Sequence, residues 1–240
     1  MRRFYAEKLN ISGDSVTLTG DEARHIKTVL RMRTGDEVLL INGEGLECIA
    51  EITDLDESSV RLAVKGRHIS SAEPDKRITL FQCLPKQGKM EVIIQKCVEL
   101  GIHAIVPTVS NRCVVKLEGK ENKLLRWNKV SVEAAKQCGR AFVPEVKPPV
   151  RLEKIDFSCF DAVLLAYENE YERSLKSVLR SGIKLDSTAI VIGPEGGFEP
   201  SEAEYIINAG GIAVSLGKRI LRTETAGMAM LAQMVYELDV

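Results

Sequence analysis

Residues 191–203 read Val191-Ile-Gly-Pro-Glu-Gly-Gly-Phe-Glu-Pro-Ser-Glu-Ala203. The apolar run that ends at Ile192 is followed by a loop with three glycines, and Pro200 suits the first turn of a helix. A strand, a loop and a helix in this order are typical of α/β folds, and glycine lets a ligand approach the main chain without meeting a Cβ. The stretch therefore predicts a strand–loop–helix unit whose loop is open to a ligand.

The same alternation extends over most of the chain after residue 76. Strand-like runs are predicted at 77–84, 104–108, 162–167, 189–192 and 213–216, and helices at 89–100, 122–138, 171–181, 200–209 and 224–237. The helix at 89–100 has the clearest pattern, because its apolar residues recur on one face and Gly101 follows it. This alternation predicts an α/β domain, with a parallel sheet and helices on both faces.

The first 70 residues have a different pattern, with short strands predicted at 3–8, 15–19, 37–41, 46–52 and 60–64. Asn42-Gly43 is a strong hairpin signal, since type I′ turns need positive φ at both central residues. One helix interrupts the strands, and Asp21 is its predicted cap. These features predict a small, mostly β barrel, followed by a polar linker at 70–76. The predicted domains are residues 1–72 and 73–240.

Composition is that of an ordinary soluble protein: 240 residues, 45% of them hydrophobic and 28% charged, with a net charge of −1. No run approaches the ~18 apolar residues of a membrane span, and no apolar segment follows the basic N-terminus, so we expect a cytosolic protein. The six cysteines form no C-x-x-C pair, and the three histidines are far apart. No metal site and no disulfide framework are therefore predicted.

A second loop with a glycine, Leu216-Gly-Lys-Arg-Ile-Leu-Arg-Thr-Glu-Thr-Ala226, also follows a predicted strand and precedes a helix. In open α/β sheets, ligands bind beyond the carboxyl ends of the strands, so two such loops favour a ligand site over simple tight turns. Neither loop has the G-x-G-x-x-G of a dinucleotide fold. Gly211 to Gly217 is one residue too long for a P-loop, and Arg219 stands where that motif has a hydroxyl. A triphosphate ligand is therefore disfavoured.

Basic residues are unevenly distributed. Arg24, Lys27 and Arg31 are three and four residues apart, so a helix would place them on one face, next to His25. Contact with phosphates is the natural use of such a stripe. The run from Arg112 to Arg140 contains eight Lys or Arg and three Glu, and its alternative interpretation is a solvated helix face.

Five blocks, in order, carry a resemblance to a known family: Arg24–Arg33, Lys89–Gly101, Glu133–Arg140, Ile192–Phe198 and Leu216–Ala226. Together they closely resemble the small-subunit ribosomal RNA methyltransferase E family of the SPOUT superfamily, over essentially the whole chain. The resemblance implies an N-terminal PUA-like domain and a SPOUT-type α/β domain with a C-terminal deep trefoil knot. General rules of chain topology argue against a knot, and no periodicity shows one.

The resemblance also implies a function. S-adenosylmethionine would be the methyl donor, the assembly would be a homodimer, and the reaction would methylate N3 of one uridine in the decoding region of small-subunit (16S) ribosomal RNA. The alternative is a non-catalytic RNA-binding or ribosome-assembly factor.

Carried over residue by residue, the resemblance implies a cofactor site at Leu84, Gly193, Glu195, Gly196, Leu216, Gly217, Ile220, Leu221 and Arg222. Core packing is the alternative for Ile220 and Leu221. The predicted RNA contacts are Arg2, Arg3, Arg24, His25, Lys27, Arg31, Arg33, Arg112 and Arg140.

Three of the residues near these loops are candidates for catalysis. Arg222 is expected to stabilise the uridine anion, and its alternative is an ion pair with Glu224 or Glu195. Either glutamate is a candidate proton acceptor, and Glu195 has the alternative role of orienting loop amides.

Overall fold

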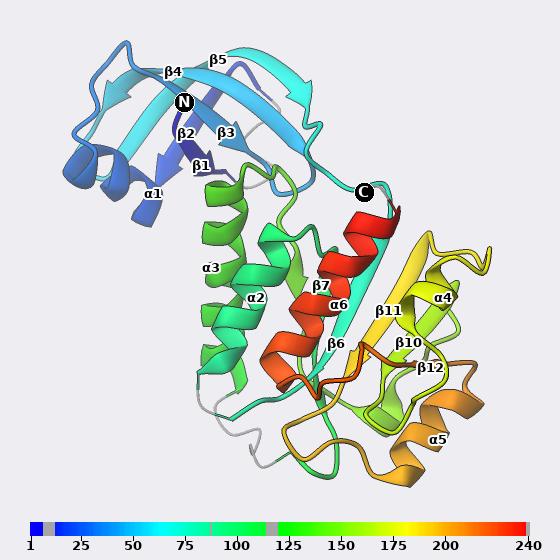
Figure 1. Cartoon of the computed structure of the whole chain (residues 1–240). Coiled ribbons are helices and arrows are strands. Elements are labelled where there is room, and N and C mark those ends of the chain that lie inside the picture. Colours follow the sequence, from blue (N-terminus) through cyan, green and yellow to red (C-terminus); the bar gives the residue numbers. More distant parts are fainter. Residues whose placement is uncertain (7–12, 87, 114–119, 239–240) are drawn as a thin grey trace. The chain divides into compact units, whose positions relative to one another are not determined.

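The computed structural model describes residues 1–6, 13–86, 88–113 and 120–238 (Figure 1). The chain divides into two compact units. The first consists of Met1–Glu73 and Val132–Val143, and the second of Pro74–Ser131 and Pro144–Val240. Helix α3 (Lys120–Cys138) crosses this division, so its last turns belong to the first unit.

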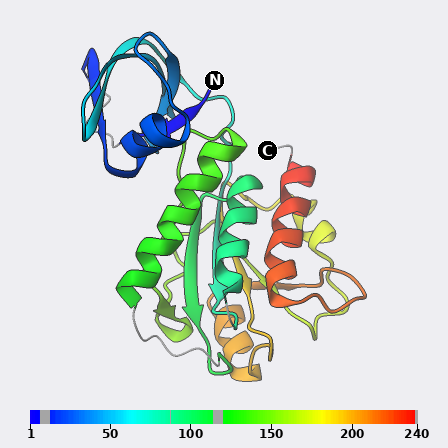
Figure 2. The ribbon, with the colours of Figure 1, turned by 90° about the vertical axis from the view of Figure 1, so that its left-hand side faces the viewer.

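The first unit is built on a five-stranded sheet. Its strand order is β1 (Arg3–Tyr5), β3 (Glu37–Ile41), β4 (Leu46–Leu55), β5 (Ser59–Ile69) and β2 (Ser15–Thr19). β1 pairs with β3 in parallel and the other pairs are antiparallel, with two register shifts between β4 and β5 that increase twist. The sheet curves into a half-barrel (Figure 2) around side chains that include Phe4, Leu40 and Ile52. Residues 7 and 8 of the predicted first strand lie outside the described residues.

Two local details of this unit differ from the prediction. The hairpin at Asn42 forms, but not as a type I′ turn, because positive φ occurs at Gly43 and Gly45 and not at Asn42. Instead, the Asn42 side-chain oxygen accepts hydrogen bonds from the backbone N–H groups of Glu44 and Leu46. The predicted cap at Asp21 is also wrong, because it lies inside the helix.

That helix is short and changes type along its length. Helix α1 (Gly20–Arg24) begins after Thr19, which provides no side-chain cap, and continues as a π-helical turn, η2 (His25–Val29). Arg31 follows with a left-handed φ of 52°, so the helix does not reach it. Because a π-helix has a wider turn than an α-helix, the three-and-four spacing of Arg24, Lys27 and Arg31 does not place them on one face.

The second unit contains a seven-stranded sheet, which confirms the predicted parallel sheet. Its order is β12 (Ile212–Val214), β10 (Ala162–Ala166), β11 (Ser187–Ile192), β6 (Arg77–Cys83), β7 (Ala104–Val109) and β8 (Glu145–Val146), and β9 (Val150–Arg151) also pairs with β7. Each pairing is parallel. β8 and β9 have two residues each, too short to give the sequence a periodic signal.

Helices cover both faces of this sheet, as predicted. α2 (Lys89–Glu99), α4 (Leu175–Leu179) and α6 (Thr223–Leu238) lie on one face (Figure 1). On the other face, α5 (Pro200–Asn208) and the 3-10 turn η3 (Leu152–Lys154) pack against β6, β10 and β11. The helix predicted at 171–181 is shorter, since Ser174 caps it by accepting the N–H of Ser177. Among the described residues, no helix combines the length and apolar character that a membrane crossing requires.

Candidate functional site

The structure brings the two predicted loops to one edge of the second sheet. The loop at 193–198 follows β11, and the loop at 215–222 follows β12. β11 and β12 both pair with β10 in parallel, so their carboxyl ends share an edge. Leu84 follows β6 at the same edge, since β6 pairs with β11 in parallel. This edge is where an open α/β sheet binds ligands.

The glycines of the two loops fall into two classes. A Cβ on Gly193 would lie 3.0 Å from the Phe198 ring, and one on Gly197 would lie 2.0 Å from a carboxylate oxygen of Glu168. The Phe198 ring thus leaves little room for a side chain at position 193, and the φ of 68° at Gly197 is a backbone conformation that favours glycine. Among the described residues, a Cβ on Gly217 would meet nothing within 4 Å, and one on Gly196 would meet only Arg112, at 3.5 Å. The main chain at Gly196 and Gly217 is thus open to a ligand.

The apolar residues of the predicted site differ in exposure. Ile220 is 87% exposed, so the core-packing alternative is wrong for it. Leu216 and Leu221 are half-buried. Leu84 is buried, and its N–H donates to the Thr108 carbonyl. An apolar ligand face could therefore contact Ile220 directly, whereas Leu84 supports the edge from within.

Lys89 links the two loops electrostatically. Its Nζ lies 3.5 Å from Oε1 of Glu195 in the first loop and 3.2 Å from Oε1 of Glu224 in the first turn of α6. Oε1 of Glu195 also accepts the backbone N–H of Lys86 at 2.9 Å. One cation thus pairs with two carboxylates from segments that are far apart in the sequence.

These contacts lower the pKa values of both carboxyls. Burial raises the pKa of Glu195, but the Lys86 N–H and the charge of Lys89 outweigh it, and the net shift is downward. The pKa of Glu224 is lowered by backbone hydrogen bonding and, against a smaller effect of burial, by Lys89 and then Arg222. A carboxylate that resists protonation is a weak proton acceptor.

Three polar residues of this edge were not predicted as site residues: Gln82, Lys89 and Thr223. The side-chain amide of Gln82 donates to Thr223 Oγ1 at 2.9 Å, and Thr223 Oγ1 donates to the Gly193 carbonyl at 2.6 Å. The signal for Gln82 was present in the sequence, because it is a polar residue between the apolar Phe81 and Cys83.

Arg112 was predicted to contact RNA, and the structure places it at the first glycine loop. Its Nη1 donates to the Gly196 carbonyl at 2.9 Å. Next to it, Asn111 donates its backbone N–H to Glu202 and its side-chain amide to Glu199, at the start of α5. The loop after β7 therefore fastens the loop after β11. The part of the basic run at residues 114–119 lies outside the described residues.

Several of the predicted RNA-contacting residues in the first unit have intramolecular partners. Arg140 is 4% exposed, and its guanidinium donates to Glu73 Oε2 at 2.8 and 3.0 Å. Arg3 pairs with Glu47, and Lys27 Nζ donates to the carbonyls of Asp56 and Glu57. His25 lies edge-on to the Phe4 ring. Arg140 thus holds the 132–143 segment in its unit, a role that the sequence did not predict.

Other predicted RNA-contacting residues of this unit remain at its surface: Arg2, Arg24, Arg31 and Arg33. Their exposure fits contact with a polyanion.

A pair of cysteines lies beside the loop after β7. Burial raises the pKa of the Cys83 thiol well above its ordinary value. Hydrogen bonding from Cys83, and then from Ser110, lowers the pKa of Cys113 to about 6, despite the opposing effect of burial. Within the described ranges, no three His, Cys, Asp or Glu side chains gather closely enough to hold a metal ion.

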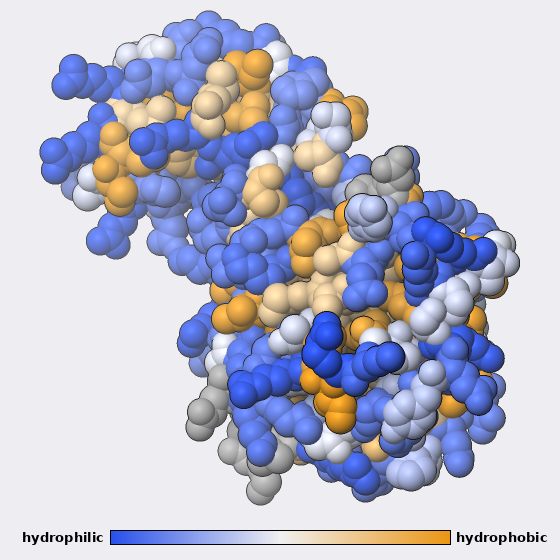
Figure 3. Space-filling view, in the orientation of Figure 1, coloured by the Kyte–Doolittle hydropathy of each residue, from blue (hydrophilic) through white to orange (hydrophobic). Residues whose placement is uncertain are grey.

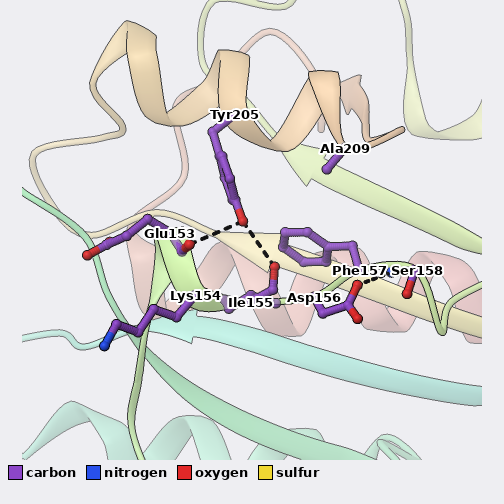
Figure 4. Close-up of a pocket in the computed structure, with 8 residues that line it drawn as sticks. All are labelled: Glu153, Lys154, Ile155, Asp156, Phe157, Ser158, Tyr205 and Ala209. Carbon is purple, nitrogen blue, oxygen red and sulfur yellow. Dashed lines mark hydrogen bonds between the residues drawn. The ribbon is translucent and has the colours of Figure 1, made fainter.

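An open hollow with a volume of about 470 Å³ lies between η3 and α5 (Figure 4). The Tyr205 hydroxyl lies 3.3 Å from the Glu153 carbonyl and 3.1 Å from that of Ile155, which fastens α5 to η3. None of the residues that line the hollow was predicted to contact cofactor or RNA. We therefore place the candidate site at the loops and not here.

The face of the second unit that carries α6 is unusually apolar. Figure 3 shows hydrophobic side chains over α2 and α6 and strongly hydrophilic ones below them. Tyr236 in α6 is 86% exposed, and Val92 in α2 is 49% exposed. α6 also buries Met230, Leu231 and Met234 against its own unit. One helix thus presents apolar residues both inward and outward.

Comparison with known proteins agrees with this architecture. Residues 72–235 match a family model described as an RNA methyltransferase domain, and residues 18–65 match an RNA methyltransferase PUA domain. The ribosomal RNA small subunit methyltransferase E of Bacillus subtilis (strain 168) is 34% identical over 250 residues, which cover 100% of this chain and 98% of that protein. Its namesake from Mycobacterium bovis is 31% identical, over 95% and 88% of the two chains.

A solved structure is similar throughout. The crystal structure of a ribosomal RNA small subunit methyltransferase E from Neisseria gonorrhoeae, bound to S-adenosyl methionine, aligns with a TM-score of 0.85 at 32% identity. The alignment covers 98% of this chain and 97% of that one.

Proposed function

The chain belongs to the ribosomal RNA small subunit methyltransferase E family, and from this premise we propose that it methylates small-subunit ribosomal RNA with S-adenosylmethionine as the donor. More specifically, we propose that the target is N3 of one uridine in the decoding region. The observation that carries the proposal is the open main chain at Gly196 and Gly217, on two loops at one edge of a parallel sheet.

The residues at this edge fit the proposed donor. A nucleoside with an amino-acid arm offers many polar atoms to main-chain N–H and C=O groups, and bare glycines give it access to them. The exposed Ile220 offers an apolar surface to a purine ring. When bound, S-adenosylmethionine would supply an electrophilic methyl group on a positively charged sulfur. The proposed site is completed by Gly193, Glu195, Leu216, Gly217, Leu221 and Arg222. Leu84 supports it from the core.

The chain's own contribution to the reaction would be mainly orientation. Holding two reactants in line contributes about 7–11 kcal/mol in favourable cases, without a covalent intermediate. Loss of the N3 proton leaves an anionic ring, and the exposed Arg222 guanidinium is the proposed group that stabilises this charge. Because the pKa values of Glu195 and Glu224 are lowered, we propose that both anchor Lys89 and orient the loops, and that the N3 proton passes to solvent water and not to either carboxylate.

We further propose the organisation that accompanies this function in the family. Residues 1–72 would form the PUA-like RNA-binding domain, and 73–240 the SPOUT methyltransferase domain with its deep trefoil knot. The exposed Arg2, Arg24, Arg31 and Arg33 would contact RNA phosphates. The enzyme would act as a homodimer in the cytoplasm, and the apolar outer face of α6 would suit a partner subunit.

The test is methyl transfer to the proposed substrate. Purified small ribosomal subunits and free small-subunit RNA from cells lacking the protein are incubated with it and with S-adenosylmethionine labelled in the methyl group. The modified nucleoside is then identified by mass spectrometry. We expect one N3-methyluridine per RNA. RNA binding without methyl transfer would instead indicate a non-catalytic RNA-binding or assembly factor.

A further inference from the structure

Three distant segments of the second unit meet in one buried hydrogen-bond chain. Gln82, near the end of β6, is completely buried, and its Nε2 donates to Thr223 Oγ1 at 2.9 Å and to the Cys83 carbonyl at 3.1 Å. Thr223 is the first residue of α6 and is 5% exposed. Its Oγ1 lies 2.6 Å from the carbonyl of Gly193, the first residue of the glycine loop. This hydrogen-bond relay, from Gln82 through Thr223 to Gly193, thus joins β6, α6 and the loop after β11.

The direction of each hydrogen bond is fixed by chemistry. The Gly193 carbonyl can only accept, so the single hydroxyl proton of Thr223 must point at it. Thr223 Oγ1 must then accept from Gln82, which requires the amide nitrogen on that side. A flipped amide would also place two carbonyl oxygens, those of Gln82 and Cys83, against each other. The order of donation therefore runs from Gln82 to Thr223 to Gly193.

Gln82 keeps this orientation although one of its atoms is unsatisfied. Its Oε1 is buried without a hydrogen-bond partner among the residues that the structure describes. A Cβ on Gly227 would lie 3.2 Å from this oxygen, so an α-hydrogen of Gly227 points toward it and makes at most a weak contact. Buried polar atoms are normally paired, and an apolar side chain would fill the same space without the unpaired oxygen. The N–H donors are thus the part of the Gln82 side chain that the fold uses.

From this geometry we propose that Gln82 and Thr223 are positioning residues for the methyl-transfer reaction. They hold the Gly193 carbonyl inward and so set the loop 193–198 relative to the start of α6 before the cofactor binds. The Phe198 ring, at 3.0 Å from the Cβ position of Gly193, blocks movement in another direction. A loop held in its binding conformation in advance loses less entropy when the ligand arrives, so the relay contributes to affinity. This inference rests on the proposed function.

The test compares variants that remove or keep the relay. Thr223→Val removes the hydroxyl at nearly constant volume, Thr223→Ser keeps it, and Gln82→Met removes the amide donors. Calorimetry with S-adenosylhomocysteine measures binding. We expect Thr223→Val and Gln82→Met each to weaken binding about tenfold or more, and Thr223→Ser to stay within about twofold of the wild type. Because the two residues act in series, the double variant should bind no worse than the weaker single variant.

Thr188 provides a matched control. It is equally buried, lies in β11 at the opposite end from the glycine loop, and donates its Oγ1 proton to the Leu185 carbonyl at 3.1 Å. Thr188→Val should reduce resistance to urea about as much as Thr223→Val does, but it should leave the affinity for S-adenosylhomocysteine unchanged. In turnover assays, Thr223→Val should raise the KM for S-adenosylmethionine and leave the KM for RNA unchanged, a split that a general loss of stability would not produce.

The outcomes are separable. Failure of the wild type to bind S-adenosylhomocysteine refutes the proposed function, and the relay with it. If the wild type binds S-adenosylhomocysteine and both Thr223→Val and Gln82→Met bind it equally tightly, the relay is refuted and the proposed function stands. If Thr223→Val does not fold, Gln82→Met and the contrast between Thr223→Ser and Thr223→Ala decide the same point. Equal weakening by Thr188→Val and Thr223→Val also overturns the inference.

Discussion

Gly196→Ala should weaken ligand binding without reducing the stability of the fold, so it tests whether a ligand approaches the main chain at this position. A Cβ at this position would lie 3.5 and 3.6 Å from the Cβ and Cδ of Arg112, which is ordinary van der Waals contact, and Gly196 does not have a positive φ. The methyl group therefore fits without strain. It also reduces the conformational freedom of the unfolded chain, which stabilises a protein by about 0.4–1 kcal/mol. We expect resistance to urea to stay the same or to increase.

Binding should change in the opposite direction. If the cofactor lies against the bare main chain of the loop, the new methyl group occupies the space through which the ligand's polar atoms reach the backbone. The loss of one or two hydrogen bonds, each worth about 0.5–1.5 kcal/mol, weakens binding by about twofold at the least and about 150-fold at the most. Gly196→Val adds two more carbons at the same place and should abolish detectable binding.

The assay is calorimetric titration with S-adenosylhomocysteine, paired with urea unfolding of each variant. Gly66→Ala in β5 is the control, because a Cβ there meets nothing within 4 Å and Gly66 also lacks a positive φ. It should leave the affinity unchanged. Gly217→Ala should lose both affinity and stability, since its φ of 119° is strained for alanine. If Gly196→Ala binds as tightly as the wild type, the ligand does not approach the main chain at this loop.

Three further predictions concern charge and reactivity. Lys89→Met removes the cation that helps to lower the pKa values of Glu195 and Glu224. A carboxyl whose pKa is lowered by folding stabilises the fold above its ordinary pKa, and this stabilisation is lost as the pH falls through the pKa of the folded state. The variant lacks part of this stabilisation, so the midpoint of its acid unfolding, followed by circular dichroism, should move to higher pH. Arg140→Met removes the guanidinium from the Glu73 carboxylate and leaves it the backbone N–H donors of Ala141 and Phe142, and urea unfolding should show a loss of about 1.5–3 kcal/mol. Because the pKa of Cys113 is about 6, its alkylation by iodoacetamide, followed by peptide mass spectrometry, should rise with pH to a plateau above about 7, and a midpoint near 8.5 would contradict the assigned environment.

The strands and helices were largely predictable because their apolar residues recur with the period of a helix or form the continuous buried runs of parallel strands. β2 and β3 have the predicted bounds, since their flanking residues are polar or glycine. β5 extends five residues beyond the predicted end because Gly66 to Ile69 pair with β4 after a register shift at Lys65, while the side chains of this stretch remain mostly exposed. Backbone pairing continues there without an apolar pattern, so the sequence carried no signal for it.

The glycine loops were predictable as a site, but the contacts that hold them were not. Gln82 and Thr223 are separated by 141 residues, and Lys89 and Glu224 by 135. Periodicity reports which side of an element is buried, but it contains no information on which distant polar groups meet. The packing of α6 against α2 and β6 brings these residues into contact.

Charge patterns were the least informative signal. Arg140 and Arg31 both belong to basic stretches, yet one is buried against Glu73 and the other is exposed beyond the end of η2. A cationic side chain has the same sequence signature whether it binds a phosphate or an internal carboxylate. The difference depends on whether the fold brings a carboxylate within reach, so exposure in the structure, and not spacing in the sequence, identifies the residues available to RNA.

The two connections between the loops differ in how they respond to solution conditions. The Lys89 ion pairs are partly exposed, so salt screens them and each contributes at most about 1 kcal/mol. The relay from Gln82 through Thr223 to Gly193 is neutral and buried, so neither salt nor pH near neutrality alters it. An RNA-modifying enzyme works among dense phosphate charges that compete for lysine. A site whose loops are joined by neutral hydrogen bonds keeps its geometry in that field, while the exposed ion pairs are free to respond to the substrate.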